Sequence, residues 1–275
     1  MNSADSKSFA SKTDWASLLL YVACGLIAFY MILPILIVFP MSFSSAEFLT
    51  FPPPGFSLKW FQRYFSDSSW TQPTYISFQI AIMTMVLSTI LGTLAAMALV
   101  RSRFWGKAAA NSLILAPMII PVIVISIALY GFFAKIGLIG TRAGLVFGHT
   151  MVCVPFVVIT VSASLKGFDE TLEMAAMICG ATRLKAFMKI TFPIIRPGMI
   201  SGALFAFIIS FDEIVISMFL CGIETRTLPL KMWEGIRMEI SPVIAAVSTL
   251  LICLSAVLLI FLEIIRRRTQ STISG

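Results

Sequence analysis

The adjacent acids Asp212 and Glu213 are the most unusual chemical feature of this sequence, because they interrupt an otherwise apolar stretch, Gly198–Leu220. A carboxylate in the middle of a bilayer costs roughly 2.5–3.5 kcal/mol, so it normally faces a bundle interior or a water-filled path. Neighbouring positions on a helix diverge by about 100°, so one acid is expected to face a path and the other to pack. With Phe211, the path-facing acid would meet a cationic solute. The alternative is an internal hydrogen bond or ion pair that holds helices in register.

The other reactive groups do not assemble into a catalytic or metal site. The five cysteines are odd in number and contain no C-x-x-C spacing, which argues against both a disulfide framework and a metal centre. The single His149 lies in an apolar stretch and is expected to be a packed polar side chain. The Gly106-Lys107 pair has Arg101 where a P-loop needs its first glycine and Ala108 where it needs Ser or Thr. We therefore expect no enzyme activity and no ATP hydrolysis by this chain itself.

The composition predicts an integral membrane protein. Of the 275 residues, 59% are hydrophobic and 12% are charged, and the mean hydropathy is +0.97. A soluble domain carries about a quarter charged residues. These values exclude a secreted disulfide scaffold and a disordered chain. The net charge of +7 is explained by membrane topology rather than by nucleic-acid binding.

Six apolar stretches are long enough to cross a bilayer as helices, which takes about 20 residues each. The runs are continuous rather than alternating, so a transmembrane barrel is excluded. The predicted fold is an all-α membrane protein with six transmembrane helices. The spans are Trp15–Phe43, Tyr75–Val100, Ala108–Phe133, Ala143–Leu165, Gly198–Leu220 and Val243–Leu262.

The basic residues predict the orientation. If the N-terminus is cytoplasmic, most of the 20 basic residues, including Lys7 and Lys12, fall on the cytoplasmic side, as the positive-inside rule requires. Residues 1–14 and 266–275 are then cytoplasmic tails. The basic residues on the cytoplasmic side are then expected to face water and the headgroups of the membrane lipids.

Two loops predicted on opposite sides of the membrane are long. The outer loop, 44–74, is rich in proline and aromatic residues, and it either lies on the membrane surface or docks an extracytoplasmic partner. The inner loop, 166–197, has a helical pattern: an amphipathic run ends at Gly180, and a second short helix, Arg183–Thr191, ends before Pro193 and Pro197. This inner piece either contacts a cytosolic partner or simply connects two spans.

The inner loop resembles the EAA loop of binding-protein-dependent ABC importer permeases. The matching residues are Met174-Ala175-Ala176, Gly180-Ala181, Phe187, Ile190 and Pro193. Met174 holds the position of the usual glutamate, and Glu173 is displaced by one residue. The chain looks closest to the spermidine/putrescine-type branch, on the segments Leu165–Asp169, Ser210–Glu213, Leu228–Lys231 and Ser241-Pro242.

This resemblance implies a type I importer permease in the bacterial inner membrane, with a first helix at 15–43 and a five-helix core at 75–265 that carries a coupling loop at 166–197. It implies a second permease subunit, which forms a heterodimer with this chain rather than a homodimer. It also implies two ATP-binding subunits that hold ATP and Mg, and an extracytoplasmic solute-binding protein. The implied solute is a polyamine or another small amine or amino-acid-like molecule, and ferric iron is an alternative. An ion-coupled secondary transporter is the other alternative, although no inverted repeat is evident. The residues implied to contact the ATPase are Glu173, Met174, Ala175, Ala176, Gly180, Ala181, Arg183 and Lys185.

Overall fold

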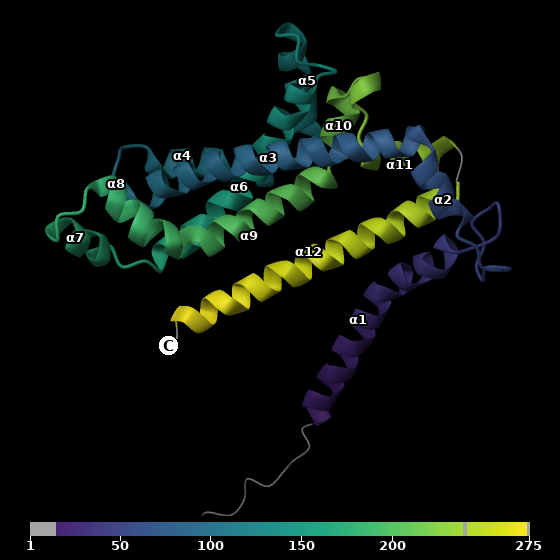
Figure 1. Ribbon diagram of the computed structural model, residues 1–275, viewed down its shortest axis with the longest axis horizontal. Helices are drawn as coiled ribbons and strands as arrows, with labels where there is room; N and C mark the ends of the chain where they lie inside the picture. The colour runs from purple at the N-terminus through teal and green to yellow at the C-terminus, as the bar shows by residue number, and fades with distance from the viewer. Residues whose placement is uncertain (1–14, 239–240, 274–275) are drawn as a thin grey trace, which may run out of the picture.

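A computed structural model describes residues 15–238 and 241–273, and the regular secondary structure within these ranges consists of helices joined by loops (Figure 1). The only extended pairing within them is one isolated bridge between Ser44 and Phe56. The predicted N-terminal tail, 1–14 with Lys7 and Lys12, lies outside the described residues. The expected all-α architecture is therefore confirmed.

Five helices of the described chain are long and apolar enough to cross a membrane, or up to six if a bent helix pair counts as one further span. They match the first, second, fourth, fifth and sixth predicted spans, although the fifth begins and ends earlier in the chain than expected. The long helices are α1 (Trp15–Ser42), α3 (Ser68–Arg101), α6 (Arg142–Lys166), α9 (Phe192–Phe211) and α12 (Val243–Ile273).

The third predicted span is broken, so the expectation of one continuous helix over Ala108–Phe133 was wrong. It consists of α4 (Lys107–Leu115), a single 3₁₀ turn and α5 (Val122–Lys135), and the two halves are bent by 102°. Pro117 and Pro121 flank the bend, and neither has an N–H to continue a helix. The Pro121 carbonyl instead accepts the first hydrogen bonds of α5.

The fifth predicted span differs at both ends. At its C-terminal end, α9 stops at Phe211 and a short helix, α10 (Val215–Leu220), follows, so the acid pair does not lie within one helix as expected. At its N-terminal end, Pro193 and Pro197 do not end the preceding helix, which was a wrong expectation. Helix α8 (Arg183–Ala186) runs through the π-helical turn η2 (Phe187–Thr191) into α9.

The π-helical turn explains how the inner helix continues past the prolines. The Phe192 N–H donates to the Phe187 carbonyl, five residues back, which is π-helical geometry. Pro193 then falls in the first turn of α9, directly after the π-helical turn, and it has no N–H to donate.

The core lies between α3, α6 and α9, which run side by side (Figure 1). Two glycines of α9 allow this approach. A Cβ at Gly198 would lie 2.8 Å from the Thr160 carbonyl oxygen, and one at Gly202 would lie 3.0 Å from the Val157 Cα. The four-residue spacing of Gly198 and Gly202 therefore serves the close packing of α9 against α6.

A second cluster closes the end of the molecule that carries α2 (Lys59–Ser66) and α11 (Leu228–Met238). Trp60, Tyr64 and Trp70 are buried there against the start of α12. These three aromatic side chains of the 44–74 loop are therefore protein core, whereas Phe48, Phe51, Phe56 and Phe65 of the same loop are exposed. Helix α1 packs mainly along α12 and separates from it toward the N-terminus (Figure 1).

Candidate functional site

The inner loop projects from one end of the bundle as two short helices, α7 (Thr171–Ile178) and α8 (Figure 1). The Asp169 carboxylate accepts the Thr171 N–H at 2.9 Å, and hydrogen bonding to Thr171 lowers the pKa of Asp169. Gly180 has φ +88 and open space around it, the left-handed conformation that glycine supplies at the end of a helix. The helix stop predicted at Gly180 is confirmed.

The side of this loop that is turned away from the bundle carries exposed apolar side chains. Ile178 is 87% exposed, Leu184 is 72% exposed and Met174 is 51% exposed. Hydrophobic side chains gathered at the tip of a projecting loop are typical of a protein contact surface. We call Leu172, Met174, Ile178 and Leu184 the loop tip surface.

The structure brings the predicted coupling residues together on this one loop, but they do not share an orientation. The exposed members are Met174, Ala175, Gly180, Arg183 and Lys185, and the partly buried members are Glu173, Ala176 and Ala181. Glu173 points toward the bundle and forms a 2.8 Å ion pair with Arg101 of α3. Arg101 was not anticipated as a site residue, because no local pattern connects positions that far apart in the chain.

The acid pair divides between two different tasks. One Glu213 carboxylate oxygen, Oε1, accepts the N–H groups of Val215 at 2.8 Å and Ile216 at 3.0 Å. Glu213 thus satisfies two of the otherwise free donors at the start of α10. This explains why the helix can break here.

Asp212 ends α9 and is exposed. It lines a hollow of about 130 Å³ between α9 and α12, opposite Leu254 and Ser255. Phe211 also lines this hollow, although most of its ring is buried and packs edge-on against Phe78 at 4.9 Å.

His149 ties the two parts of the broken fifth span to α6. Its Nδ1 lies 2.9 Å from the Ser210 hydroxyl of α9, and its Nε2 lies 3.3 Å from the Ser217 hydroxyl of α10. Ser217 donates its own proton to the Glu213 carbonyl, so it accepts from His149 Nε2–H, and Ser210 donates to Nδ1. His149 is 1% exposed, so the expectation of a packed polar side chain is confirmed.

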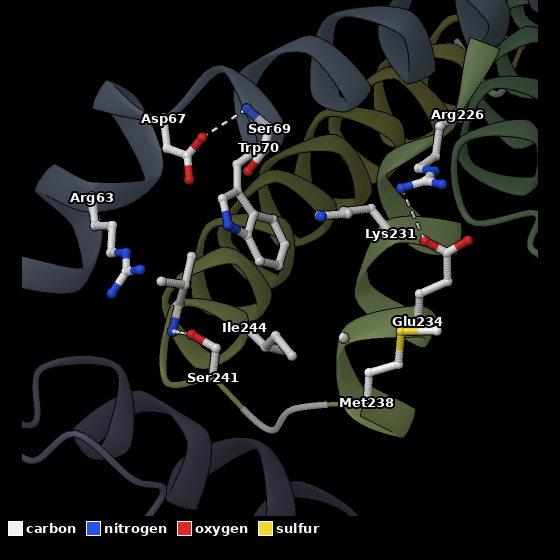
Figure 2. A pocket seen from close by; sticks show the side chains of 12 residues that line it. Arg63, Asp67, Ser69, Trp70, Arg226, Lys231, Glu234, Met238, Ser241 and Ile244 are labelled. Carbon is white, nitrogen blue, oxygen red and sulfur yellow. Dashed lines mark hydrogen bonds and ion pairs between the residues drawn. The ribbon is translucent and has the colours of Figure 1, made fainter. Parts of the chain in front are cut away.

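At the opposite end, charged residues surround a hollow of about 420 Å³ between α2, α3 and α11 (Figure 2). Arg226 pairs with Glu234 at 3.4 Å. The Lys231 ammonium lies 5.6 Å from the Trp70 ring centre. Asp67 accepts the Ser69 N–H at 2.8 Å, which lowers the pKa of Asp67 and keeps it ionised.

Arg63 and Lys231 form no ion pair within the described part of the chain, although both lie near enough to Asp67 to lower its pKa further. We call the hollow the outer basic hollow, after the side of the membrane that the basic residues predict for this end of the chain. It carries three basic and two acidic side chains, so its excess charge favours an anionic group.

Comparison with known proteins reveals consistent similarities. Residues 88–271 match the family model described as "Binding-protein-dependent transport system inner membrane component". The spermidine/putrescine transport system permease protein PotC of Haemophilus influenzae is 33% identical over 242 residues, which cover 88% of this chain and 93% of that protein. The putrescine transport system permease protein PotI of Escherichia coli is 34% identical over 226 residues, which cover 80% of each.

The fold is similar to that of solved importers. A crystal structure of a bacterial ABC transporter involved in the import of the acidic polysaccharide alginate aligns with a TM-score of 0.72 and 20% identity, over 94% of this chain and 99% of that one. An amino acid ABC transporter crystallised with histidines aligns with a TM-score of 0.55 over 77% of this chain. At these identities the likeness concerns the fold alone, and it confirms the expected importer permease architecture.

Proposed function

Because this chain belongs to the family of binding-protein-dependent transport system inner membrane components, we propose that it is a permease subunit of an ATP-driven importer for polyamines. The observation that carries this proposal is the similarity over most of the chain to spermidine/putrescine and putrescine permeases. The single histidine and the scattered cysteines give no support to an enzyme. Both termini are assigned to the cytoplasm on the distribution of basic residues.

The proposed assembly contains a second, different permease subunit, two ATP-binding subunits that hold ATP and Mg, and an extracytoplasmic solute-binding protein. The first helix at 15–43 accompanies the five-helix core at 75–265. The loop tip surface docks on an ATP-binding subunit, since its exposed apolar side chains need a protein partner outside the membrane. Arg183 and Lys185 flank this contact and are also exposed.

The solute path is proposed to pass Asp212 rather than Glu213. Asp212 is exposed at a break in a membrane helix, where irregular backbone is tolerated if it lines a cavity. Both carboxylates are expected to be costly in a membrane, but Glu213 already accepts two backbone N–H groups. Phe211 supports the same hollow with its buried ring.

The outer basic hollow is proposed as the docking point for acidic side chains of the solute-binding protein. Arg63 and Lys231 would attract carboxylates and repel the cationic solute itself. This separates the docking surface from the proposed solute path at Asp212.

Reconstitution tests the function directly. The proteoliposomes contain this chain, its partner permease and the ATP-binding subunits, and the binding protein loaded with radiolabelled putrescine or spermidine is added outside. The vesicles should accumulate the radiolabelled polyamine only when ATP is enclosed inside them. Uptake driven by an ion gradient without ATP would instead favour a secondary transporter. Competition by 4-aminobutyrate or ferric iron, without competition by polyamines, would reassign the solute.

A pair of matched variants tests the loop tip surface. Ile178→Glu should abolish copurification of the ATP-binding subunits, because it places a charge at an apolar contact. Ile223→Glu introduces the same charge at a position that is 92% exposed at the other end of the protein, and it should leave copurification unchanged. Equal copurification in both variants would refute the docking assignment.

A second pair tests the path. Asp212→Asn should lower polyamine uptake at unchanged protein level, whereas Glu213→Gln should have little effect, because the amide oxygen can still accept the α10 N–H groups. Full uptake by Asp212→Asn would remove the path proposal.

A further inference from the structure

Arg101, the last residue of α3, contacts the inner loop at three places. Its guanidinium lies 5.2 Å from the Phe168 ring centre, before α7 begins. Its Nη1 pairs with Glu173 Oε2 of α7 at 2.8 Å. Its Nη2 donates to the Thr191 hydroxyl at 3.2 Å, at the junction with α9. We call these four residues the inner clamp.

The inner clamp is closed on itself. The Thr191 hydroxyl that accepts from Arg101 also donates to Glu173 Oε2 at 3.1 Å. Arg101, Glu173 and Thr191 therefore form a ring of three polar contacts that joins α3, α7 and the π-helical turn before α9. Hydrogen bonds with ionised partners are the stronger kind in proteins.

The clamp is also shielded from water. The side chains of Arg101 and Glu173 are 20% and 17% exposed, and Thr191 is fully buried. Salt screens such a pair less than an exposed one. The arrangement therefore differs from an ordinary surface ion pair, which contributes little.

Helix α7 packs chiefly against α8 and the π-helical turn, which belong to the same loop. Among the hydrogen bonds and ion pairs of the described residues, those that join α7 to the end of α3 run through Glu173. The contact face of α7, by contrast, consists of exposed apolar side chains such as Ile178. Attachment and docking are thus carried by different residues of one helix.

The displaced glutamate acquires a physical explanation. Met174 holds the position usual for the EAA glutamate and is 51% exposed, while Glu173, rotated by about 100°, turns toward the bundle. Because the acid is at 173 rather than 174, its carboxylate faces the bundle instead of the exposed side of α7.

We infer that the inner clamp makes α7 and the inner ends of α3 and α9 move as one body, so that a displacement of α7 by an ATP-binding subunit reaches these two spans. This inference rests on the proposed function and deepens it, because it assigns positioning residues to the coupling step. Arg101, Glu173 and Thr191 position the loop, and none of them needs to touch the ATPase.

The test measures coupling in the complete reconstituted transporter, as polyamine molecules imported per ATP hydrolysed. Glu173→Gln and Arg101→Gln should each lower this ratio about tenfold, within the usual range of coupling between sites, while the ATP-binding subunits copurify in wild-type amounts. The matched controls are Glu170→Gln, which removes an exposed acid from the start of α7, and Arg103→Gln, which removes an exposed base near the end of α3. Both controls should keep the wild-type ratio.

The double variant and a milder variant sharpen the result. Because Arg101 and Glu173 share one network, the double variant should fall no further than either single variant. Thr191→Val keeps the ion pair and removes only the hydroxyl, so it should lower the ratio about two- to threefold and accumulate normally even if the charge variants do not.

A distance measurement gives a readout independent of transport. Spin labels on the exposed Cys179 and on an introduced R103C, with the other cysteines replaced, should keep one narrow distance distribution through the ATP cycle. The same pair in Glu173→Gln should give a broadened distribution.

Three results would overturn the inference: a wild-type import ratio in Glu173→Gln and Arg101→Gln, additive losses in the double variant, or a parallel loss of ATPase copurification, which would show a purely structural role. Absence of ATP-dependent uptake by the unmodified transporter would instead refute the proposed function. The two failures are therefore distinguishable.

Discussion

Substitution of Gly202 by alanine should measure how tightly α6 and α9 are held together. The new Cβ would lie 2.5 Å from the Thr160 hydroxyl oxygen and 3.0 Å from the Val157 Cα. The hydroxyl can rotate away, but the Cα belongs to the α6 backbone and cannot. The two helices must therefore separate by several tenths of an ångström.

The expected cost follows from this geometry. Inserting a methyl group into a well-packed interface costs about 1–3 kcal/mol, against which alanine gains about 0.5–1 kcal/mol of helix propensity over glycine. Gly131→Ala in α5 is the matched control, because nothing lies within 4 Å of its added Cβ and it receives the same propensity gain. The difference between the two variants isolates the packing cost.

Thermal unfolding of the purified protein in detergent gives the measurement. At about 2–4 °C per kcal/mol for a large domain, Gly202→Ala should unfold roughly 2–12 °C below Gly131→Ala. Equal midpoints for the two variants would refute the close approach of α6 and α9 at this position.

Three further outcomes are expected. His149→Ala should lower the free energy of unfolding by at least about 2 kcal/mol, because it opens a cavity and leaves two buried serine hydroxyls without their partner; an unchanged thermal midpoint would contradict the bridge. Glu213→Ala should cost about 1 kcal/mol through loss of the α10 cap, whereas Glu213→Gln should cost less, and the reverse order in thermal unfolding would exclude capping. Lys231→Glu should slow association of the solute-binding protein in surface plasmon resonance, most strongly at low salt, and a salt-independent rate equal to wild type would argue against the outer basic hollow as a docking point.

Hydropathy predicted the long helices because each needs only a sustained apolar run. It missed the breaks in the third and fifth spans, since apolar residues on either side of a bend look alike. The residue types at the breaks did indicate them. Pro117 and Pro121 lack backbone N–H donors at one break, and Glu213 supplies a carboxylate that accepts backbone N–H groups at the other. The acids of the fifth span were interpreted only as path or register residues, and the capping role became visible with the backbone.

The inner loop was predictable as far as its local patterns reach. The amphipathic run and Gly180 define α7 and its end, as expected. The orientation of Glu173 was not predictable, because it depends on Arg101 and Thr191, which other parts of the chain bring to it. Contacts between distant segments follow from packing and leave no periodic trace in the sequence.

The loose association of α1 with the rest of the chain bears on how this protein can vary. Between Ser17 and Leu36, every side chain that the structure describes is exposed, so the rest of this chain places few packing demands on this helix. Any apolar residue of good helix propensity should serve there equally well. Random mutagenesis of this stretch should accordingly yield many neutral replacements, while the glycines facing α6 should admit almost none.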